Sequence, residues 1–481
     1  MLRRQILQAL VALPLFFIVI PVVVLVAIST LPFKGLVIIL AKIFRPDLDD
    51  IVTGLSGVFT SYPNLNIVYY WYFDEHLSPE PDWFVRALND EGRRRYRRLL
   101  QYWTTFCGYK FWKEDLNFDS KNHYREYDYT GDLELRQEFT EEDTHRIMGK
   151  LITAPWKVGQ SPWEAFPIPL PGPSSKTLLI FRHHHALMDG FSTMNYTSEV
   201  LRTKIEFKPA RKESKTGNSF LYSLLRLPYD LAGYEMDKRM YQPDWQFPPV
   251  GGTRDLQSTC LKSITVDKVK LAKNKLDTSY PIVLLSVLAG GLQRMFEEAH
   301  LPVPEFLPAV IPLPMPNHPG GTVNHVIIAR FRWPIKADSV PERFKRVQEK
   351  IQQLSSPALL RIIGMLADLY GSVPAYLSKA VANASASGCS VVTSIFPVVD
   401  VTSEMQIRNM VCALGTSGND IGTTFLSSGL NGDQRIVLIM DKRICPEDKI
   451  FYNYEKFVEA ELDELLMYAE TTGKHSEVCA V

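Results

Sequence analysis

The amino-terminal segment has no charged side chain over residues 5–33, and most of its residues 6–31 are Leu, Ile, Val or Phe. A helix of about 20 apolar residues is long enough to cross the hydrocarbon core of a bilayer. The run is longer than the apolar part of a secretory signal, which has about 7 to 15 residues, and no clear small-residue cleavage site follows it. The sequence therefore predicts a retained membrane anchor over residues 1–45.

Two prolines leave the path of this anchor open. Pro14 and Pro21 each remove a backbone donor and favour a kink. The anchor can cross the bilayer as one transmembrane helix, or it can turn back as a hairpin. Either path holds the rest of the chain at a membrane.

The remainder of the chain is long enough for two lobes. The protein has 481 residues, of which 46% are hydrophobic, and single cores stop growing near about 250 to 300 residues. A polar stretch over residues 208–219 has the composition of a boundary. We expect an amino-terminal lobe over residues 46–215, a crossover linker over residues 216–255 and a carboxy-terminal lobe over residues 256–481.

The most informative string reads Arg-His-His-His-Ala-Leu-Met-Asp-Gly over residues 182–190. It follows an apolar run within residues 176–183 that is typical of a buried strand, and it precedes helical spacing over residues 192–207. A side chain at such a junction can point into a cleft from a rigid support. Because free imidazole has a pKa near about 6.5, His185 can take the proton of a hydroxyl group at working pH.

Two other roles compete for the three histidines. Consecutive residues of an extended segment point to alternating sides, so they make a poor tetrahedral metal site. A buried structural histidine explains one imidazole well and three poorly. The favoured hypothesis is therefore catalysis without a metal, with His185 as the base and His184 beside it.

Asp189 and Gly190, the last two residues of the string, are expected to have structural roles. We expect Asp189 to brace the turn through a buried arginine, because an unpaired buried carboxylate is costly. We expect Gly190 to adopt a backbone conformation that other residues avoid.

The same residues resemble a known signature. His184, His185, Asp189 and Gly190 fit the HHxxxDG pattern of the coenzyme A-dependent acyltransferase superfamily. The chain is similar to the wax ester synthase/diacylglycerol acyltransferase family from about residue 141 to residue 441. The resemblance implies a two-lobed α/β fold, with mixed sheets flanked by helices and a tunnel between the lobes. It also implies that His185 is the general base and that Asp189 is structural.

Further likenesses lie on both sides of the signature. Trp163, within Pro-Trp-Glu, resembles the family's Pro-Leu-Trp element, and Asn324 falls where a Gly-Asn pair is usual. Thr393 and Ser394 lie in a segment similar to one that ends in Ser-Asn in relatives. These four residues are candidates for the oxyanion site or the tunnel wall, and the hydroxyl of Thr393 or Ser394 is the candidate oxyanion donor.

The resemblance implies an O-acyltransferase that moves a fatty acyl group from acyl-CoA to a long-chain alcohol or diacylglycerol, giving wax ester or triacylglycerol. Acyl-CoA is then a co-substrate, no cofactor is bound, and the partners are the lipid acceptor and membrane lipid. Because acyl-CoA is mainly cytosolic, we expect the lobes to face the cytosol at the endoplasmic reticulum or a lipid droplet.

Two alternative functions stay open. Pro281 and Ile282 stand where relatives carry Asn-Asp, which favours a non-catalytic membrane-bound lipid carrier or scaffold with the same fold. The other alternative is an acyltransferase for a small non-lipid acceptor. The anchor argues against this alternative, because tethering chiefly helps an enzyme whose substrates are in the bilayer.

Charge excludes one class of partner and marks one local cluster. The 53 Lys and Arg residues balance the 53 Asp and Glu residues, so no global field recruits nucleic acid. Five arginines lie within residues 93–98. Such a run is usually a solvated helix face, and the alternative is a site for lipid head groups or coenzyme A phosphates.

Small residues predict one close helix contact in the second lobe. Residues 280–299 have the composition of an apolar helix, and Ala289, Gly290 and Gly291 lie near its middle. Their small side chains would let a neighbouring element approach closely.

Overall fold

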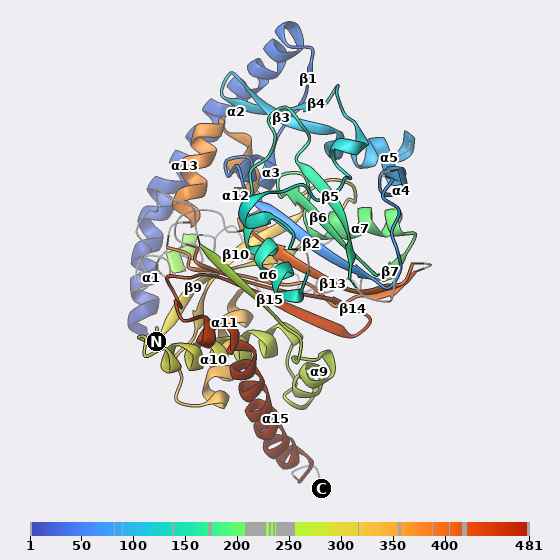
Figure 1. Cartoon of the computed structure of the whole chain (residues 1–481). Helices are drawn as coiled ribbons and strands as arrows, with labels where there is room; N and C mark the ends of the chain where they lie inside the picture. The colour runs from blue at the N-terminus through green and yellow to red at the C-terminus, as the bar shows by residue number, and fades with distance from the viewer. Residues whose placement is uncertain are drawn as a thin grey trace.

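The structure is a computed structural model of the chain (Figure 1). It describes residues 2–478 with the exception of 81, 89, 137–138, 172–175, 207–227, 230–231, 234–235, 237–254, 316, 355–356, 387, 404 and 416–420. Almost all of the crossover linker expected over residues 216–255 therefore lies outside the described residues.

The first sheet has four antiparallel strands in the order β13-β2-β6-β5. These strands are β13 (Ile407–Leu414), β2 (Asn66–Phe73), β6 (Lys176–His184) and β5 (Trp163–Leu170). All residues of β6 after the first are buried, because the strand is central and both faces of the sheet are covered. The strand expected over residues 176–183 is thus confirmed, with one more residue at its end.

The second sheet is mixed and has six strands. Strand β11 runs parallel to both of its neighbours, β9 and β14, and the other pairs are antiparallel. In sheet order the strands are β10 (Val326–Pro334), β9 (Phe306–Pro314), β11 (Val391–Ile395), β14 (Thr423–Leu430), β15 (Asp433–Asp441) and β8 (Leu256–Leu261).

Smaller sheets and helices complete the two-lobed α/β fold. The small sheets are formed by β1 (Leu48–Ile51), β4 (Tyr109–Glu114) and β3 (Gln101–Phe106), and by β7 (Lys204–Glu206) with β12 (Asp400–Thr402). The helices of the first half, after the amino-terminal ones, are α3 (Gly54–Phe59), α4 (Asp82–Val85), α5 (Asp90–Arg95), α6 (Glu141–Leu151) and α7 (Gly190–Leu201). Those of the second half are α9 (Val266–Lys275), α10 (Tyr280–Glu298), α11 (Val340–Leu354), α12 (Pro357–Ser372), α13 (Ala375–Ala386), α14 (Asp448–Tyr452) and α15 (Tyr454–Val478).

The two lobes share strands and core. Strand β13 belongs to the second half of the sequence but pairs with β2 of the first sheet over almost its full length. One hydrophobic cluster combines Val68 and Tyr70 of β2 with Cys260 of β8 and Val437 of β15. The lobes are therefore joined by a strand and a common core as well as by the segment between them.

The amino-terminal segment is one uninterrupted helical rod. Helix α1 (Leu2–Pro14) passes through a π-helical turn over Leu15–Val19 into α2 (Ile20–Phe44), and Figure 1 shows the rod along one side of the molecule. Its 43 residues, counted from residue 2 to residue 44, correspond to about 65 Å. The chain does not turn back at the prolines, so the structure has a continuous helix where the hairpin was considered.

Part of this rod is attached to the first lobe. Val37 and Ala41 are buried against Tyr109 and Phe111 of β4, and the Tyr109 hydroxyl lies 3.3 Å from the Thr30 carbonyl. Most other large apolar side chains of the rod are exposed. Residues Val24–Phe44 are long and apolar enough to cross a membrane, a criterion of length and composition that signal sequences also meet.

The close contact at Ala289 to Gly291 is confirmed. A Cβ atom on Gly290 would lie 2.0 Å from the carboxylate of Glu461, and one on Gly291 would lie 2.5 Å from Val458 of α15. Glu461 is nearly fully buried and pairs with Arg294, at 2.7 Å, and with Arg343. The glycines thus allow α15 to bring a buried carboxylate onto α10.

We expect Gly290→Ala to destabilise the protein by about 1 to 3 kcal/mol, because the new methyl group displaces a buried, ion-paired carboxylate. Urea unfolding monitored by tryptophan fluorescence measures the change. Glu298→Ala, on the exposed part of the same helix, is the control and should stay within about 0.5 kcal/mol of the wild type. Equal stability of the two variants would contradict the packing argument.

Candidate active site

The histidine string forms a strand, a turn and a helix. Strand β6 ends at His184, and α7 begins at Gly190 with Asp189 as its N-cap residue. The His185 amide donates to the Leu65 carbonyl at 2.8 Å, and the Leu187 amide donates to the His184 carbonyl at 3.0 Å. These bonds hold the turn against the segment that precedes β2.

His184 has both ring nitrogens committed to the backbone. Nε2 donates to the Tyr62 carbonyl at 2.8 Å, and Nδ1 accepts from the Ala186 amide at 3.0 Å. The residue is completely buried, and burial lowers its pKa to about 3. His184, grouped with the base in the sequence hypothesis, is therefore a neutral residue that positions the turn.

His183 is buried on the other side of the strand. Its ring nitrogens lie 3.1 Å from the His184 carbonyl and 2.9 Å from the Thr193 hydroxyl. Burial lowers its pKa to about 3 as well. Two of the three imidazoles thus have structural partners.

His185 differs from its two neighbours because the residue is partly exposed. Its ring packs on Phe59 of α3, with 4.3 Å between ring centroids. Nδ1 is buried and makes no hydrogen bond within the described part of the chain. Burial lowers the pKa of His185, while contacts with its own carbonyl, Asp189, Asn324 and the Met188 carbonyl oppose the shift. The ring is therefore neutral at working pH.

Asp189 connects the turn to the loop between β9 and β10. Its carboxylate accepts from the Ser192 amide at 2.9 Å and from the His325 amide at 2.7 Å, and it lies 3.2 Å from Nε2 of His318. Burial alone would raise the pKa of Asp189, but these hydrogen bonds outweigh it and lower the pKa. The expected brace is present, but its partners are a histidine and two backbone amides, so the prediction of a buried arginine was wrong.

Asn324 holds the backbone of the turn from the same loop. Its side-chain amide donates to the His185 carbonyl at 2.8 Å and to the Ser56 hydroxyl at 3.0 Å. Its carbonyl oxygen is buried without a hydrogen bond among the described residues. Asn324 therefore positions His185, and its amide is not free to serve as an oxyanion donor.

Gly190 is needed for space. The residue lies in the first turn of α7, and its φ is not positive. A Cβ atom there would lie 2.9 Å from the ring of Phe396, which follows β11. The expectation of an unusual backbone conformation was wrong, because close approach of this ring excludes a larger residue.

Thr393 and Ser394 lie on opposite faces of β11. Thr393 pairs with Phe425, which belongs to the core of the second lobe, and its hydroxyl donates to the Val310 carbonyl at 3.2 Å. Ser394 pairs with Leu426, which packs in the cluster of the first lobe. Because side chains alternate along a strand, Ser394 faces the first lobe and Thr393 faces away from it. Of the two candidate donors, the structure brings Ser394 toward the motif.

Trp163 is a core residue of the first lobe. It is completely buried, its indole N–H donates to the Leu99 carbonyl at 2.7 Å, and its ring stacks on His123. The next residue, Glu164, forms a buried ion pair with Arg182 at 2.7 Å. The Pro-Trp-Glu element therefore supports β6 through β5, and Trp163 lies in the core with no exposed surface.

The arginine run mainly pairs with acidic side chains. Arg95 binds Glu199, and Arg97 and Arg98 both contact Asp49. The Arg95 carbonyl also accepts from the Thr322 amide at 3.2 Å, in the loop that carries Asn324. The segment thus supports the loop of the second lobe that holds the motif.

Sequence reasoning missed three residues around His185. Phe59, His318 and Phe396 come from segments far apart in the sequence and meet the motif only in the fold. His318 had a weak local signal, since it lies in a Pro- and Gly-rich stretch where a histidine has little reason to be in a core. The two phenylalanines had none.

We expect acid to destabilise the protein through His183 and His184. Each stays neutral in the folded state down to a pH of about 3, whereas each takes a proton near pH ~6.5 when unfolded. Stability is therefore complete above pH ~6.5 and falls below it, by up to about 1.4 kcal/mol per pH unit for each histidine. Urea unfolding at several pH values measures this slope.

A variant at His184 tests whether the pH dependence of stability comes from the motif. His184→Gln keeps an amide donor for the Tyr62 carbonyl but does not titrate. The part of the stability slope between pH 6 and pH 4 that comes from the two histidines should therefore fall by about half. His76→Gln, at an exposed histidine, should leave it unchanged. An unaltered slope in His184→Gln would contradict the assignment.

Comparisons with known proteins relate this geometry to one fold. No family model matches the chain, and no curated protein matches it by sequence. Among solved structures, it is similar to a wax ester synthase/diacylglycerol acyltransferase from Marinobacter aquaeolei VT8, with 16% identity, a TM-score of 0.56, and coverage of 88% of this chain and 100% of that one.

Two further structures show how widely the fold is used. The trichothecene 15-O-acetyltransferase TRI3 from Fusarium sporotrichioides has 11% identity and a TM-score of 0.56, covering 86% of this chain and 94% of that one. The first condensation domain of the CDA synthetase has 12% identity and a TM-score of 0.52, covering 87% and 96%. The protein therefore shares the two-lobed α/β fold of these two acyltransferases and this condensation domain.

Proposed function

We propose that the protein is an acyl-CoA-dependent O-acyltransferase with His185 as the general base. The observation that carries the proposal is the contrast among the three histidines at the end of β6. His183 and His184 are sealed and fully partnered, whereas His185 is neutral, partly exposed and held by Asn324 and Phe59.

We assign the two ring nitrogens of His185 different tasks. Nδ1 is buried and makes no hydrogen bond within the described part of the chain, so an incoming hydroxyl group cannot reach it, and we assign the ring proton to Nδ1. A neutral ring protonated there has its free lone pair on Nε2. Nε2 is then the atom that accepts a proton from an acceptor hydroxyl.

The reaction needs no covalent acyl-enzyme intermediate. As Nε2 takes the hydroxyl proton, the oxygen attacks the thioester carbonyl carbon, and the carbon–sulfur bond breaks when the tetrahedral intermediate collapses. The proton passes from His185 to the leaving thiolate of coenzyme A, so the ester and the free thiol are the products. The Ser394 hydroxyl is the candidate donor to the oxyanion, because it faces the first lobe near Phe396.

The proposed acceptor is a long-chain alcohol or diacylglycerol. Two features support a lipid acceptor: the apolar rod with its exposed surface, and the fold shared with an enzyme described as a wax ester synthase/diacylglycerol acyltransferase. Membrane attachment at the endoplasmic reticulum or a lipid droplet, with the lobes in the cytosol, is part of the same proposal. The equal TM-score to a trichothecene acetyltransferase makes a small hydroxylated acceptor the second candidate.

We expect His185→Ala to lower turnover by a factor on the order of 10² or more, because it removes the base from the transition state. The assay uses the purified full-length protein and radiolabelled palmitoyl-CoA, with hexadecanol, diacylglycerol or a small polycyclic alcohol as the acceptor. Label should enter wax ester or triacylglycerol in the wild type. Label in the ester of the small alcohol alone would support the second candidate.

Control variants separate chemistry from folding. His76→Ala removes an exposed histidine and should retain wild-type turnover, and circular dichroism should show that His185→Ala is folded. Activity of a folded His185→Ala variant at a near wild-type rate would remove His185 from the mechanism. Lipid binding by a wild type that never transfers label would indicate the non-catalytic carrier.

The pH dependence of kcat/KM tests the base directly. Because burial lowers the pKa of His185, the unprotonated base persists below the usual histidine range around pH ~6.5. The acid limb of the kcat/KM profile should therefore have its midpoint below about 6.5. A midpoint clearly above that value would show that the titrating base is another group.

A further inference from the structure

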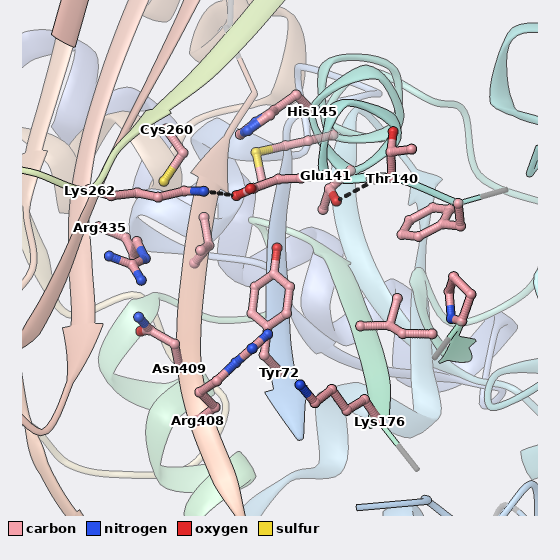
Figure 2. A pocket seen from close by; sticks show the side chains of 16 residues that line it. Tyr72, Thr140, Glu141, His145, Lys176, Cys260, Lys262, Arg408, Asn409 and Arg435 are labelled. Atoms are coloured by element: carbon pink, nitrogen blue, oxygen red, sulfur yellow. Dashed lines mark hydrogen bonds and ion pairs between the residues drawn. The ribbon is translucent and has the colours of Figure 1, made fainter. Parts of the chain in front are cut away.

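A cavity lies at the far end of the strand that carries the motif. It has a volume of about 390 Å³ and is lined by α6, the first sheet and the second sheet (Figure 2). Lys176, its contribution from β6, begins the strand that His184 ends. Eight steps of about 3.3 Å place this cavity roughly 26 Å from the motif, so it is separate from the candidate active site.

The lining of this cavity is strongly cationic. Its wall contains four basic side chains and one carboxylate, namely Lys176, Lys262, Arg408, Arg435 and Glu141. The carboxylate of Glu141 is paired with Lys262, and Figure 2 shows this pair across one side of the cavity. The remaining charge on the wall is therefore positive.

Carboxylates outside the lining compensate two of the remaining three cations. Arg435 contacts Asp433 at 2.6 Å, and Lys176 lies 3.9 Å from Asp74. Arg408 has no carboxylate within ion-pair distance among the described residues, and its guanidinium lies over the ring of Tyr72, at 5.5 Å from the centroid. The tyrosine ring thus supports an uncompensated cation at the cavity.

A polar atom on the opposite wall also lacks a partner. Nδ1 of His145 is buried and makes no hydrogen bond within the described segments, although the residue lines the cavity from α6. The cavity thus has the Arg408 cation on one wall and His145, whose Nδ1 is itself buried, on the other.

Apart from Thr140, Thr144 and Asn409, much of the remaining lining is apolar. Met148 and Val411 belong to the core cluster that joins the lobes, and Leu170 packs against that cluster from the end of β5. Phe139 and Pro171 line the cavity beside them. The volume lies within the range of about 300 to 1,000 Å³ that is typical of small-molecule sites. Such a site suits a molecule with one anionic end and one apolar end.

We propose that this cavity is a binding site for an anionic amphiphile, with a carboxylate or phosphate head at Arg408 and an apolar chain along Met148, Leu170 and Val411. Arg408 supplies a planar guanidinium, which binds either oxyanion in a two-pronged geometry. The ligand bridges the two lobes, because α6 and β2 belong to the first half of the chain and β8, β13 and β15 to the second. The proposal does not depend on the reaction at His185.

Calorimetric titration of the full-length protein tests the site with four probes of defined chemistry. Decanoate and decyl phosphate carry both parts of the proposed ligand, decanol lacks the charge, and inorganic phosphate lacks the chain. The two anionic amphiphiles should bind more tightly than decanol and phosphate. If only one of these two amphiphiles binds, its head group, carboxylate or phosphate, is the one that the site recognises. Inorganic phosphate that binds as tightly as decyl phosphate would overturn the proposal that the ligand is an amphiphile.

Variants locate the binding. Arg408→Gln should weaken binding of the anionic probe about 10-fold, which corresponds to about 1.4 kcal/mol, and Leu170→Trp should weaken it by filling the apolar end. Lys345→Gln removes one positive charge from an exposed position on α11 and should leave the dissociation constant unchanged. Thermal unfolding verifies that each variant is folded. Dissociation constants within twofold of wild type in both Arg408→Gln and Leu170→Trp would overturn the site.

Discussion

The buried carboxylate of Asp189 is the interaction on which the geometry of the histidine turn depends. A charge with so little exposed surface is costly unless it is fully hydrogen-bonded. Two of its partners, His318 and the His325 amide, come from the loop between β9 and β10. That loop therefore has to remain docked on the turn, and Asn324 is carried with it to the His185 carbonyl. The carboxylate thus fixes the loop of the second lobe beside His185 without a hydrogen bond to the His185 ring.

Three consecutive histidines have three different environments because a strand ends among them. His183 and His184 are still in β6 and alternate between its two covered faces, so each is buried and partnered. His185 is the first residue beyond the strand, where the backbone turns and the side chain is no longer covered by the neighbouring strands. The ring is then supported by Phe59 and by the backbone bonds of the turn. The position of the strand end therefore determines which of the three imidazoles is partly exposed.

The sequence predicted what depends on local pattern and missed what depends on distant segments. The apolar run before the histidines gave β6 to within one residue, and the small residues at 289–291 correctly indicated close helix packing. Strand β13 could not be assigned to the first sheet, because pairing with β2 joins residues more than 300 positions apart. The same limit explains the errors at Asp189 and Gly190. Both residues were recognised as structural, but their partners His318 and Phe396 are set by tertiary packing that no local pattern encodes.

The shared strands also limit which elements can couple a site in one lobe to a site in the other. Strand β6 is hydrogen-bonded on both edges and buried on both faces, so it is a poor element for a change between two arrangements. Coupling between distant sites requires an element with two arrangements, and binding at each site has to favour one of them. The boundary between the lobes is the better candidate, because the cavity at Arg408 and the loop at Asn324 both join residues of the first half to residues of the second. Any influence of an occupied cavity on His185 would therefore act by changing the packing between the lobes. Asp189 is the contact that resists their separation.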